Sequence, residues 1–121
     1  MRIGEIARRS GLSRDTIRFY ERNGLIASSP AVGATNSYRD YDDEMVERLH
    51  MIREAQAAGF TIADLFLFIR QLEQAPADNF DAEAFLDRKI AEIEHTIARS
   101  KRFLQTLQAT RRALAGERDF D

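Results

Sequence analysis

The chain has 121 residues, enough for one small domain with an appendage or for two small pieces. Hydrophobic residues make up 44% and charged residues 31%, which allows a core, and the absence of cysteine excludes disulfides, thiolate metal sites and a cysteine nucleophile. His50 and His95 lie far apart, so we expect no metal site and no cofactor. Polar residues interrupt every apolar run before the roughly 18 residues of a membrane span, and no apolar leader follows Met1. We therefore expect a cytoplasmic protein without membrane association.

Charge is distributed unevenly along the chain. The formal net charge is −2, yet residues 1–39 carry seven arginines against three acids, a local charge of +4, so residues 40–121 sum to −6. A basic head on an acidic body is typical of a protein that meets phosphate through the head alone. The arginines are Arg2, Arg8, Arg9, Arg14, Arg18, Arg22 and Arg39.

The first 25 residues predict two short helices joined by a tight turn. Apolar residues from Ile3 to Leu12 have helical spacing, and Gly11 can adopt the left-handed conformation that ends a helix. Ser13 is a good N-cap for the second helix, which Gly24 stops. Two such helices joined by about four residues form a helix-turn-helix.

Residues 26–41 predict a β-hairpin, or wing. The run from Ala27 to Ser37 is small, uncharged and turn-rich, and the residues from Tyr38 to Tyr41 alternate in the β manner. We expect Tyr41 to point inward or to pack on the helices, and Tyr38 and Arg39 to lie at the hairpin tip.

Two further helices complete a predicted head of residues 1–75. Asp42 can cap a helix over residues 43–58, which Gly59 ends. Thr61 and Asp64 form a capping-box pair for a helix over 62–74. That helix has five consecutive apolar residues, from Leu65 to Ile69, so it must bury two faces.

The last segment has the most regular pattern. Residues 82–115 predict a helix of roughly 50 Å whose apolar residues alternate in steps of four and three over four heptads. The seam includes Leu86, Ile90, Ile93, Ile97, Leu104, Leu107 and Leu114, with Ser100 and Arg111 as its polar members. So long a helix favours pairing with a second copy of itself over folding back on its own domain. We assign 80–115 to a dimerisation coiled coil and 116–121 to a short tail.

The order of these elements resembles the MerR family of transcription regulators. The matching strings are IGEIARRSGLS at 3–13, TIRFYERNGLI at 16–26, YRDYDDE at 38–44 and the GF-T pattern at 59–61. The sequence itself resembles the family over residues 1 to about 74. The remaining residues resemble it only in architecture, as one long helix. It implies a mainly α fold, with a winged helix-turn-helix head, a small β-hairpin wing and a long antiparallel dimerisation coiled coil. It also implies a homodimer that bends and untwists double-stranded promoter DNA for RNA polymerase when an effector binds.

The resemblance assigns DNA contacts to Ser13, Thr16, Arg18 and Phe19 on the second helix and to Tyr38 and Arg39 on the wing. Arg14 joins them because it lies one helical turn from Arg18 and shares its face. Whether Arg18 reads a base or a phosphate stays open. Asp15 is interpreted as an acid at its own helix N-terminus rather than a cytosine contact. The wing lacks Lys and Arg between residues 26 and 37, where relatives of the family often carry them.

The sequence says least about the effector that the regulator would bind. Because the chain has no cysteine, we expect no sensing of thiophilic metals or of redox state, and because only six residues follow the coiled coil, we expect no sensor domain in this chain. Five aromatic residues near the joint between head and long helix are either core or the lining of a small apolar pocket for an organic effector. They are Phe60, Phe66, Phe68, Phe80 and Phe85.

Two other functions remain as alternatives: an architectural or excisionase-like DNA-binding protein that regulates no promoter, and a protein-interaction adaptor that uses only the coiled coil. The long helix argues against the former, and the arginine-rich head against the latter. An enzyme is not expected, because the sequence has no nucleophile–base pair, phosphate-binding glycine loop or metal set.

Overall fold

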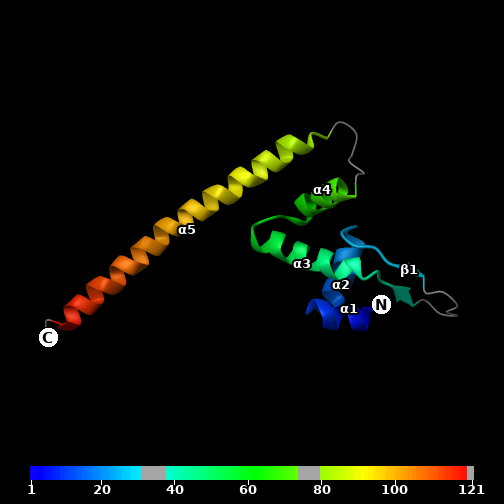
Figure 1. Cartoon of the computed structure of the whole chain (residues 1–121), viewed down its shortest axis with the longest axis horizontal. Helices are drawn as coiled ribbons and strands as arrows, with labels where there is room; N and C mark the ends of the chain where they lie inside the picture. Colours follow the sequence, from blue (N-terminus) through cyan, green and yellow to red (C-terminus); the bar gives the residue numbers. More distant parts are fainter. Residues whose placement is uncertain (31–37, 74–79, 120–121) are drawn as a thin grey trace. The chain divides into compact units, whose positions relative to one another are not determined.

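The computed structural model describes residues 1–30, 38–73 and 80–119 (Figure 1). The chain divides into two compact units, a head of Met1–Phe80 and a second unit of Asp81–Asp121. The elements in chain order are α1 (Ile3–Ser10), α2 (Arg14–Arg22), β1 (Ser29–Pro30), β2 (Arg39–Asp40), α3 (Glu44–Ala57), α4 (Ile62–Leu72) and α5 (Ala82–Asp119). The prediction of a mainly helical chain with one hairpin and a long final helix is confirmed.

Helices α1 and α2 form the predicted helix-turn-helix. Gly11 follows α1 with φ 76°, a left-handed conformation that costs glycine little, and its N–H donates to Ala7 O. The Ser13 side chain then accepts from the Thr16 N–H and caps α2. Arg53 of α3 donates to Ser10 O at 3.0 Å and so ties the end of α1 to the third helix.

The wing is a two-stranded antiparallel sheet in the described residues. Ser29 pairs with Asp40 and Pro30 with Arg39. The predicted wing tip lies outside the described residues. Arg39 lies within β2 and pairs with Pro30, and its predicted place at the hairpin tip stays a prediction.

Capping residues set the starts of the next two helices. The Glu44 N–H donates to Asp42 Oδ1 at 3.1 Å. At α4, Thr61 and Asp64 form the predicted capping box, with both hydrogen bonds present at 3.0 Å. The boundaries of both helices lie within two residues of those predicted from the sequence.

One hydrophobic core holds the head together. Its buried members come from α1, α2, the wing, α3 and α4, so each element contributes to the same cluster. They are Ile6, Ile17, Tyr20, Leu25, Ile26, Tyr41, Leu49, Ile52, Leu65 and Ile69. The expectation that Tyr41 points inward is confirmed, since only 2% of it is exposed.

Helix α5 has 38 residues and begins after Asp81, whose carboxylate accepts from the Ala84 N–H at 3.0 Å. It continues to Asp119, beyond the predicted end at residue 115. An interior glycine such as Gly116 costs a helix only about 1 kcal/mol relative to alanine, which is too little to end it. No helix in the described ranges is long and apolar enough to cross a membrane.

Candidate nucleic-acid interface

The outer face of α2 carries two exposed arginines, Arg14 and Arg18, one turn apart. The core residues Ile17 and Tyr20 are buried on the opposite side, which orients this face outward. Arg18 Nη1 lies 3.4 Å from Asp15 Oδ1, and the Asp15 side chain is 97% exposed. An exposed pair of this kind contributes about 0–1 kcal/mol. Phosphate can therefore displace Asp15 from Arg18 at little cost.

Ser13 and Thr16 are already hydrogen-bonded to each other. The Ser13 hydroxyl donates to Thr16 Oγ1 at 2.8 Å and accepts from the Thr16 N–H at 3.1 Å. Their first role in the free chain is thus to cap α2. Phe19, also predicted to contact DNA, is 41% exposed, and its ring centroid lies 6.0 Å from that of Tyr20.

A cleft of about 480 Å³ joins α1, α2 and the wing. Four arginines enter its lining, which comprises Arg2, Ile3, Gly4, Arg14, Arg18, Tyr38, Arg39 and Tyr41. The cleft brings together predicted DNA contacts from separate parts of the sequence, namely Arg14 and Arg18 with Tyr38 and Arg39. Guanidinium groups are suited to bidentate hydrogen bonds with phosphate oxygens.

Two contacts fix the side chains of this cleft. The Arg14 guanidinium passes over Gly4, because a Cβ built on Gly4 would lie 2.9 Å from Arg14 Nη2. Arg2 Cζ lies 4.1 Å from the ring centroid of Tyr38, within cation–π range. Helix α1 therefore supports both the recognition helix and the start of β2.

Glu21, at the end of α2, connects the recognition helix to the wing. Its Oε1 accepts from the Tyr41 hydroxyl at 2.6 Å and its Oε2 from the Ser28 hydroxyl at 2.5 Å. Arg39 Nη2 lies 3.7 Å from the same Oε2, and Arg39 Nε donates to Ser28 Oγ at 2.8 Å. One carboxylate thus fixes the strand that carries Arg39 relative to α2.

The electrostatics of this cluster follow from these contacts. Burial by itself raises the pKa of Glu21, but hydrogen bonds from Ser28 and Tyr41 and the charge of Arg39 outweigh it. The pKa of Glu21 therefore lies below its ordinary value of 4.5. Burial, together with the adjacent Glu21 carboxylate, raises the pKa of Tyr41 to about 12. Glu21 is thus charged and Tyr41 protonated at neutral pH.

Sequence reasoning missed four residues of this interface: Arg2, Gly4, Glu21 and Ser28. Arg2 was counted in the basic head but not placed, because nothing in the sequence indicates that it reaches Tyr38. Glu21 belongs to the matching string at 16–26, but the string does not indicate that its carboxylate contacts the wing. One signal was available in the sequence. A carboxylate at the end of a basic helix would repel phosphate, which indicates that Glu21 pairs with a residue of its own chain.

The predicted aromatic cluster is only partly assembled within the head. The rings of Phe60 and Phe68 pack edge to face with centroids 6.0 Å apart. Phe66 is 40% exposed, with Arg70 Cζ 5.7 Å from its ring centroid. Phe85, in the other unit, is buried. The proposed effector pocket among these residues stays a prediction.

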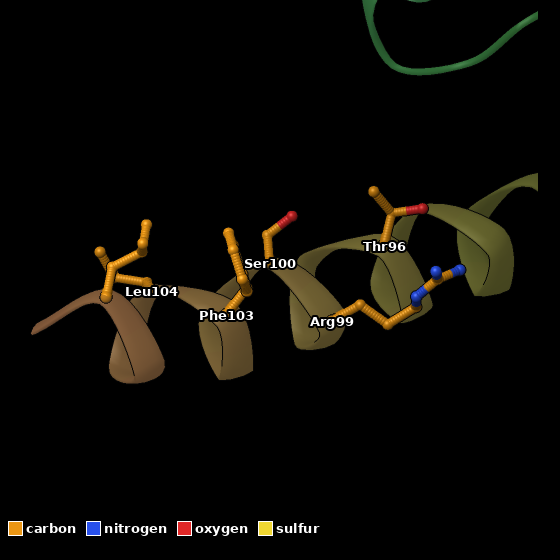
Figure 2. Close-up of a pocket in the computed structure, with 6 residues that line it drawn as sticks. Thr96, Arg99, Ser100, Phe103 and Leu104 are labelled. Carbon is orange, nitrogen blue, oxygen red and sulfur yellow. The ribbon is translucent and has the colours of Figure 1, made fainter. Parts of the chain in front are cut away.

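The predicted seam of α5 is an exposed apolar row. Half or more of each of five seam side chains is accessible: Ile90, Ile97, Leu104, Leu107 and Leu114. Ile93 and Leu86 are partly exposed. Phe103, which the seam pattern omitted, is 62% exposed and lies beside the row, where it lines a groove with Ser100 and Leu104 (Figure 2).

A helix-turn-helix with a short wing and an arginine-lined cleft defines a DNA-binding protein of the winged helix-turn-helix class. The sequence profile described as "MerR HTH family regulatory protein" matches residues 1–72, and the profile described as "MerR, DNA binding" matches 46–114. The chain belongs to the MerR family, and it is a DNA-binding transcription regulator.

Individual relatives agree with this assignment. The chain is 37% identical over 108 residues to the HTH-type transcriptional regulator HmrR of Sinorhizobium medicae, covering 89% of this chain and 72% of that protein. It is 35% identical over 106 residues to the mercuric resistance operon regulatory protein of Bacillus cereus, covering 88% and 79%. The fold is also similar to that of HiNmlR, a MerR family regulator lacking the sensor domain, in its crystal structure bound to promoter DNA. The two chains superpose with a TM-score of 0.69 at 23% identity, and the match covers 91% of this chain and 87% of HiNmlR.

Proposed function

We propose that this regulator is a cytoplasmic homodimer that binds two half-sites of a bacterial promoter and bends and untwists the DNA for RNA polymerase. The observation that carries the proposal is the cleft in which Arg2, Arg14, Arg18 and Arg39 converge from α1, α2 and β2. Helix α2 would enter the major groove, and the wing would follow the backbone beside it.

The two parts of the interface would act differently. Arg14 and Arg18, on a rigid helix, are placed to reach base edges or the phosphates that border them. Arg39 and Tyr38 project from the wing, where a guanidinium and a phenol suit phosphate oxygens. Ser13 and Thr16 would support the start of α2 and contact the backbone there.

Dimerisation through α5 would supply the second head. An isolated helix gains little from exposing Ile90, Ile97, Leu104, Leu107 and Leu114 along one side, whereas a partner helix removes that surface from water. Two heads on one rod match a two-fold symmetric operator.

We further propose a small, mostly apolar organic effector held among Phe60, Phe66, Phe68, Phe80 and Phe85. The chain has no cysteine, and the described residues contain no group of three or more metal-ligating side chains. A ligand that binds one arrangement of the heads better than another would shift the population toward it and change the bend imposed on DNA.

DNase footprinting on the DNA upstream of the protein's own gene tests the proposal. We expect a protected, two-fold symmetric site whose protection is lost in the Arg14→Ala/Arg18→Ala variant. The Arg112→Ala/Arg102→Ala variant removes the same charge from α5 and is expected to protect the site as the parent does. Equal loss of protection in both variants would mean that net charge, not the face of α2, determines binding.

A further inference from the structure

Helix α1 has no side chain at the position where an arginine of α2 lies against it. Gly4 occupies this position, next to the guanidinium of Arg14. We infer that Gly4 is a positioning residue for DNA recognition, because the absence of a side chain lets the Arg14 guanidinium rest on α1 within the arginine-lined cleft. The inference rests on the proposed contact of α2 with DNA and specifies how one of its arginines is held.

The distances show how little room a larger residue would have. A Cβ on Gly4 would lie 2.9 Å from Nη2 of Arg14, 3.6 Å from its Cζ and 4.0 Å from its Nε. Ordinary contacts between carbon atoms are about 3.5–4.0 Å, so even the methyl group of alanine would push Nη2 away. All three atoms belong to one flexible side chain. A substitution at residue 4 therefore displaces Arg14 and leaves the backbone of both helices in place.

The backbone of α1 does not itself require glycine at residue 4. Gly11, Gly24 and Gly59 have positive φ angles, which glycine adopts at little cost. Gly4 instead belongs to the first turn of α1, and glycine is among the poorest helix formers. Alanine at this position would stabilise the helix. Gly4 thus weakens its own helix, and what it provides in return is space for Arg14.

Packing on Gly4 is the main restraint on Arg14. Arg18 lies 3.4 Å from one carboxylate oxygen and Arg39 lies 3.7 Å from another, whereas no carboxylate of the described residues pairs with Arg14. An unpaired guanidinium keeps its full attraction for phosphate. A side chain that is already restrained also loses less conformational freedom when DNA binds.

A substitution at Gly4 changes the position of Arg14 but not its charge. Binding to DNA of any sequence depends mainly on charge. A specific complex also requires each guanidinium at a fixed point along the groove. Gly4 is therefore expected to determine the ratio of specific to non-specific affinity rather than affinity for DNA in general.

Gly4→Ala tests the inference on two DNA duplexes. We expect it to raise the dissociation constant for the duplex protected in footprinting about fivefold, because Arg14 must then be ordered during binding. The constant for a scrambled duplex of the same composition is expected to change less than about twofold. The midpoint of thermal unfolding is expected to rise by about 1–3 °C. A more stable chain with weaker specific binding is a result that a purely structural role of Gly4 does not produce.

Two controls isolate the contact with Arg14. Gly116→Ala makes the same change within α5, where a Cβ meets no atom within 4 Å, and is expected to stabilise the helix without altering either DNA affinity. In the Arg14→Ala background, Gly4→Ala is expected to change the affinity for the protected duplex less than about 1.5-fold, because the side chain that it displaces is gone.

Nuclear magnetic resonance provides a measurement that needs no DNA. The Nε–H resonance of Arg14 is assigned by its loss in Arg14→Ala, and its ¹⁵N relaxation reports the mobility of the guanidinium. We expect an order parameter of about 0.8 in the parent chain and below about 0.6 in Gly4→Ala. An equally ordered guanidinium in both chains would show that Gly4 does not restrain Arg14.

The outcomes separate the inference from the proposed function. If Arg14→Ala/Arg18→Ala binds the protected duplex as the parent does, the proposed contact of α2 with DNA is refuted. If that variant loses binding while Gly4→Ala binds as the parent does, the interface stands and the positioning role of Gly4 is refuted. A lower unfolding midpoint in Gly4→Ala, with equal losses on both duplexes, also overturns that role, because Gly4 would then only support the fold.

Discussion

Replacing Glu21 with alanine removes the carboxylate that joins the recognition helix to the wing. The Tyr41 hydroxyl donates to Glu21 at 2.6 Å and the Ser28 hydroxyl at 2.5 Å, so the substitution affects two hydrogen bonds at once. It also leaves Arg39 without its internal carboxylate. Tyr41 is 2% exposed, so its phenol has little access to replacement water.

The magnitude follows from these contacts. Leaving the buried Tyr41 hydroxyl without an acceptor costs about 1–3 kcal/mol, and loss of the ion pair to the half-exposed Arg39 costs up to about 1 kcal/mol. We therefore expect Glu21→Ala to lower the free energy of unfolding by about 1–4 kcal/mol. Glu21→Gln keeps an acceptor oxygen and removes only the charge, so we expect a loss of about 1–2 kcal/mol.

Urea denaturation followed by circular dichroism measures these losses, at one protein concentration for all variants because the chain is proposed to dimerise. Tyr41→Phe removes the donor and serves as the matched control. In a double-mutant cycle, Glu21→Ala in the Tyr41→Phe background should cost about 1 kcal/mol less than in the parent. Additive losses, or a loss under about 0.5 kcal/mol for Glu21→Ala, would refute the assignment of Glu21 as the link.

Protonation of Glu21 at low pH should lower the free energy of unfolding, as Glu21→Gln does. The pKa of Glu21 is lowered below its ordinary value of 4.5 in the folded chain. The stabilisation is therefore fully present above about pH 4.5 and is lost as the pH falls through the folded-state pKa. Glu21→Gln is expected to flatten this acidic limb of the stability profile. A profile unchanged between parent and variant would contradict the linkage.

Three further predictions concern the DNA contact, the dimer and the effector. If Arg18 reads a base, Arg18→Ala should weaken operator binding by about 1–3 kcal/mol and relax the preference at one base position. If Arg18 contacts phosphate, the same substitution should flatten the salt dependence of binding by about one unit of slope. Unchanged affinity and unchanged slope in a gel-shift titration would exclude α2 as the reader. Ile93→Glu/Ile97→Glu should abolish dimerisation in sedimentation, because it places four carboxylates in one seam, and persistence of the dimer would locate the interface elsewhere. Phe66→Ala and Phe68→Ala should remove the ligand response in transcription assays before they remove DNA binding, whereas unfolding without a ligand-specific defect would make these rings core.

Local signals in the sequence predicted the elements of the head well. Ser13, Gly11 and the Thr61–Asp64 pair each act within one turn of the helix that they begin or end, so their effect does not depend on the rest of the fold. The periodicity of residues 82–115 likewise predicted α5, since a helix of that length repeats its own pattern. Helix α5 continues to Asp119, beyond the predicted end at residue 115, because the seam pattern shows where a partner is needed and not where the helix ends.

The interface was harder to predict, because its geometry depends on residues far apart in sequence. Arg2 and Tyr38 are 36 positions apart, yet the guanidinium lies 4.1 Å from the ring centroid. Arg14 of α2 passes over Gly4 of α1, ten positions earlier in the chain. Helical spacing determines which residues share a face of one helix, but it does not determine which side chain of another element covers that face.

Two of the four arginines that line the cleft, Arg18 and Arg39, lie beside carboxylates, and this has consequences for DNA binding. Arg18 lies 3.4 Å from Asp15, and Arg39 lies 3.7 Å from Glu21, so each cation has an internal carboxylate. The two pairs differ in mobility: Asp15 is almost fully exposed, while Glu21 is held by Ser28 and Tyr41. Arg18 can therefore exchange its carboxylate for DNA with small cost. We expect Glu21 to stay in place when DNA binds and to keep the wing aligned, while its charge reduces the attraction of the head for phosphate on any sequence. Such an arrangement favours sites where α2 and the wing both fit, because attraction to phosphate alone is weakened.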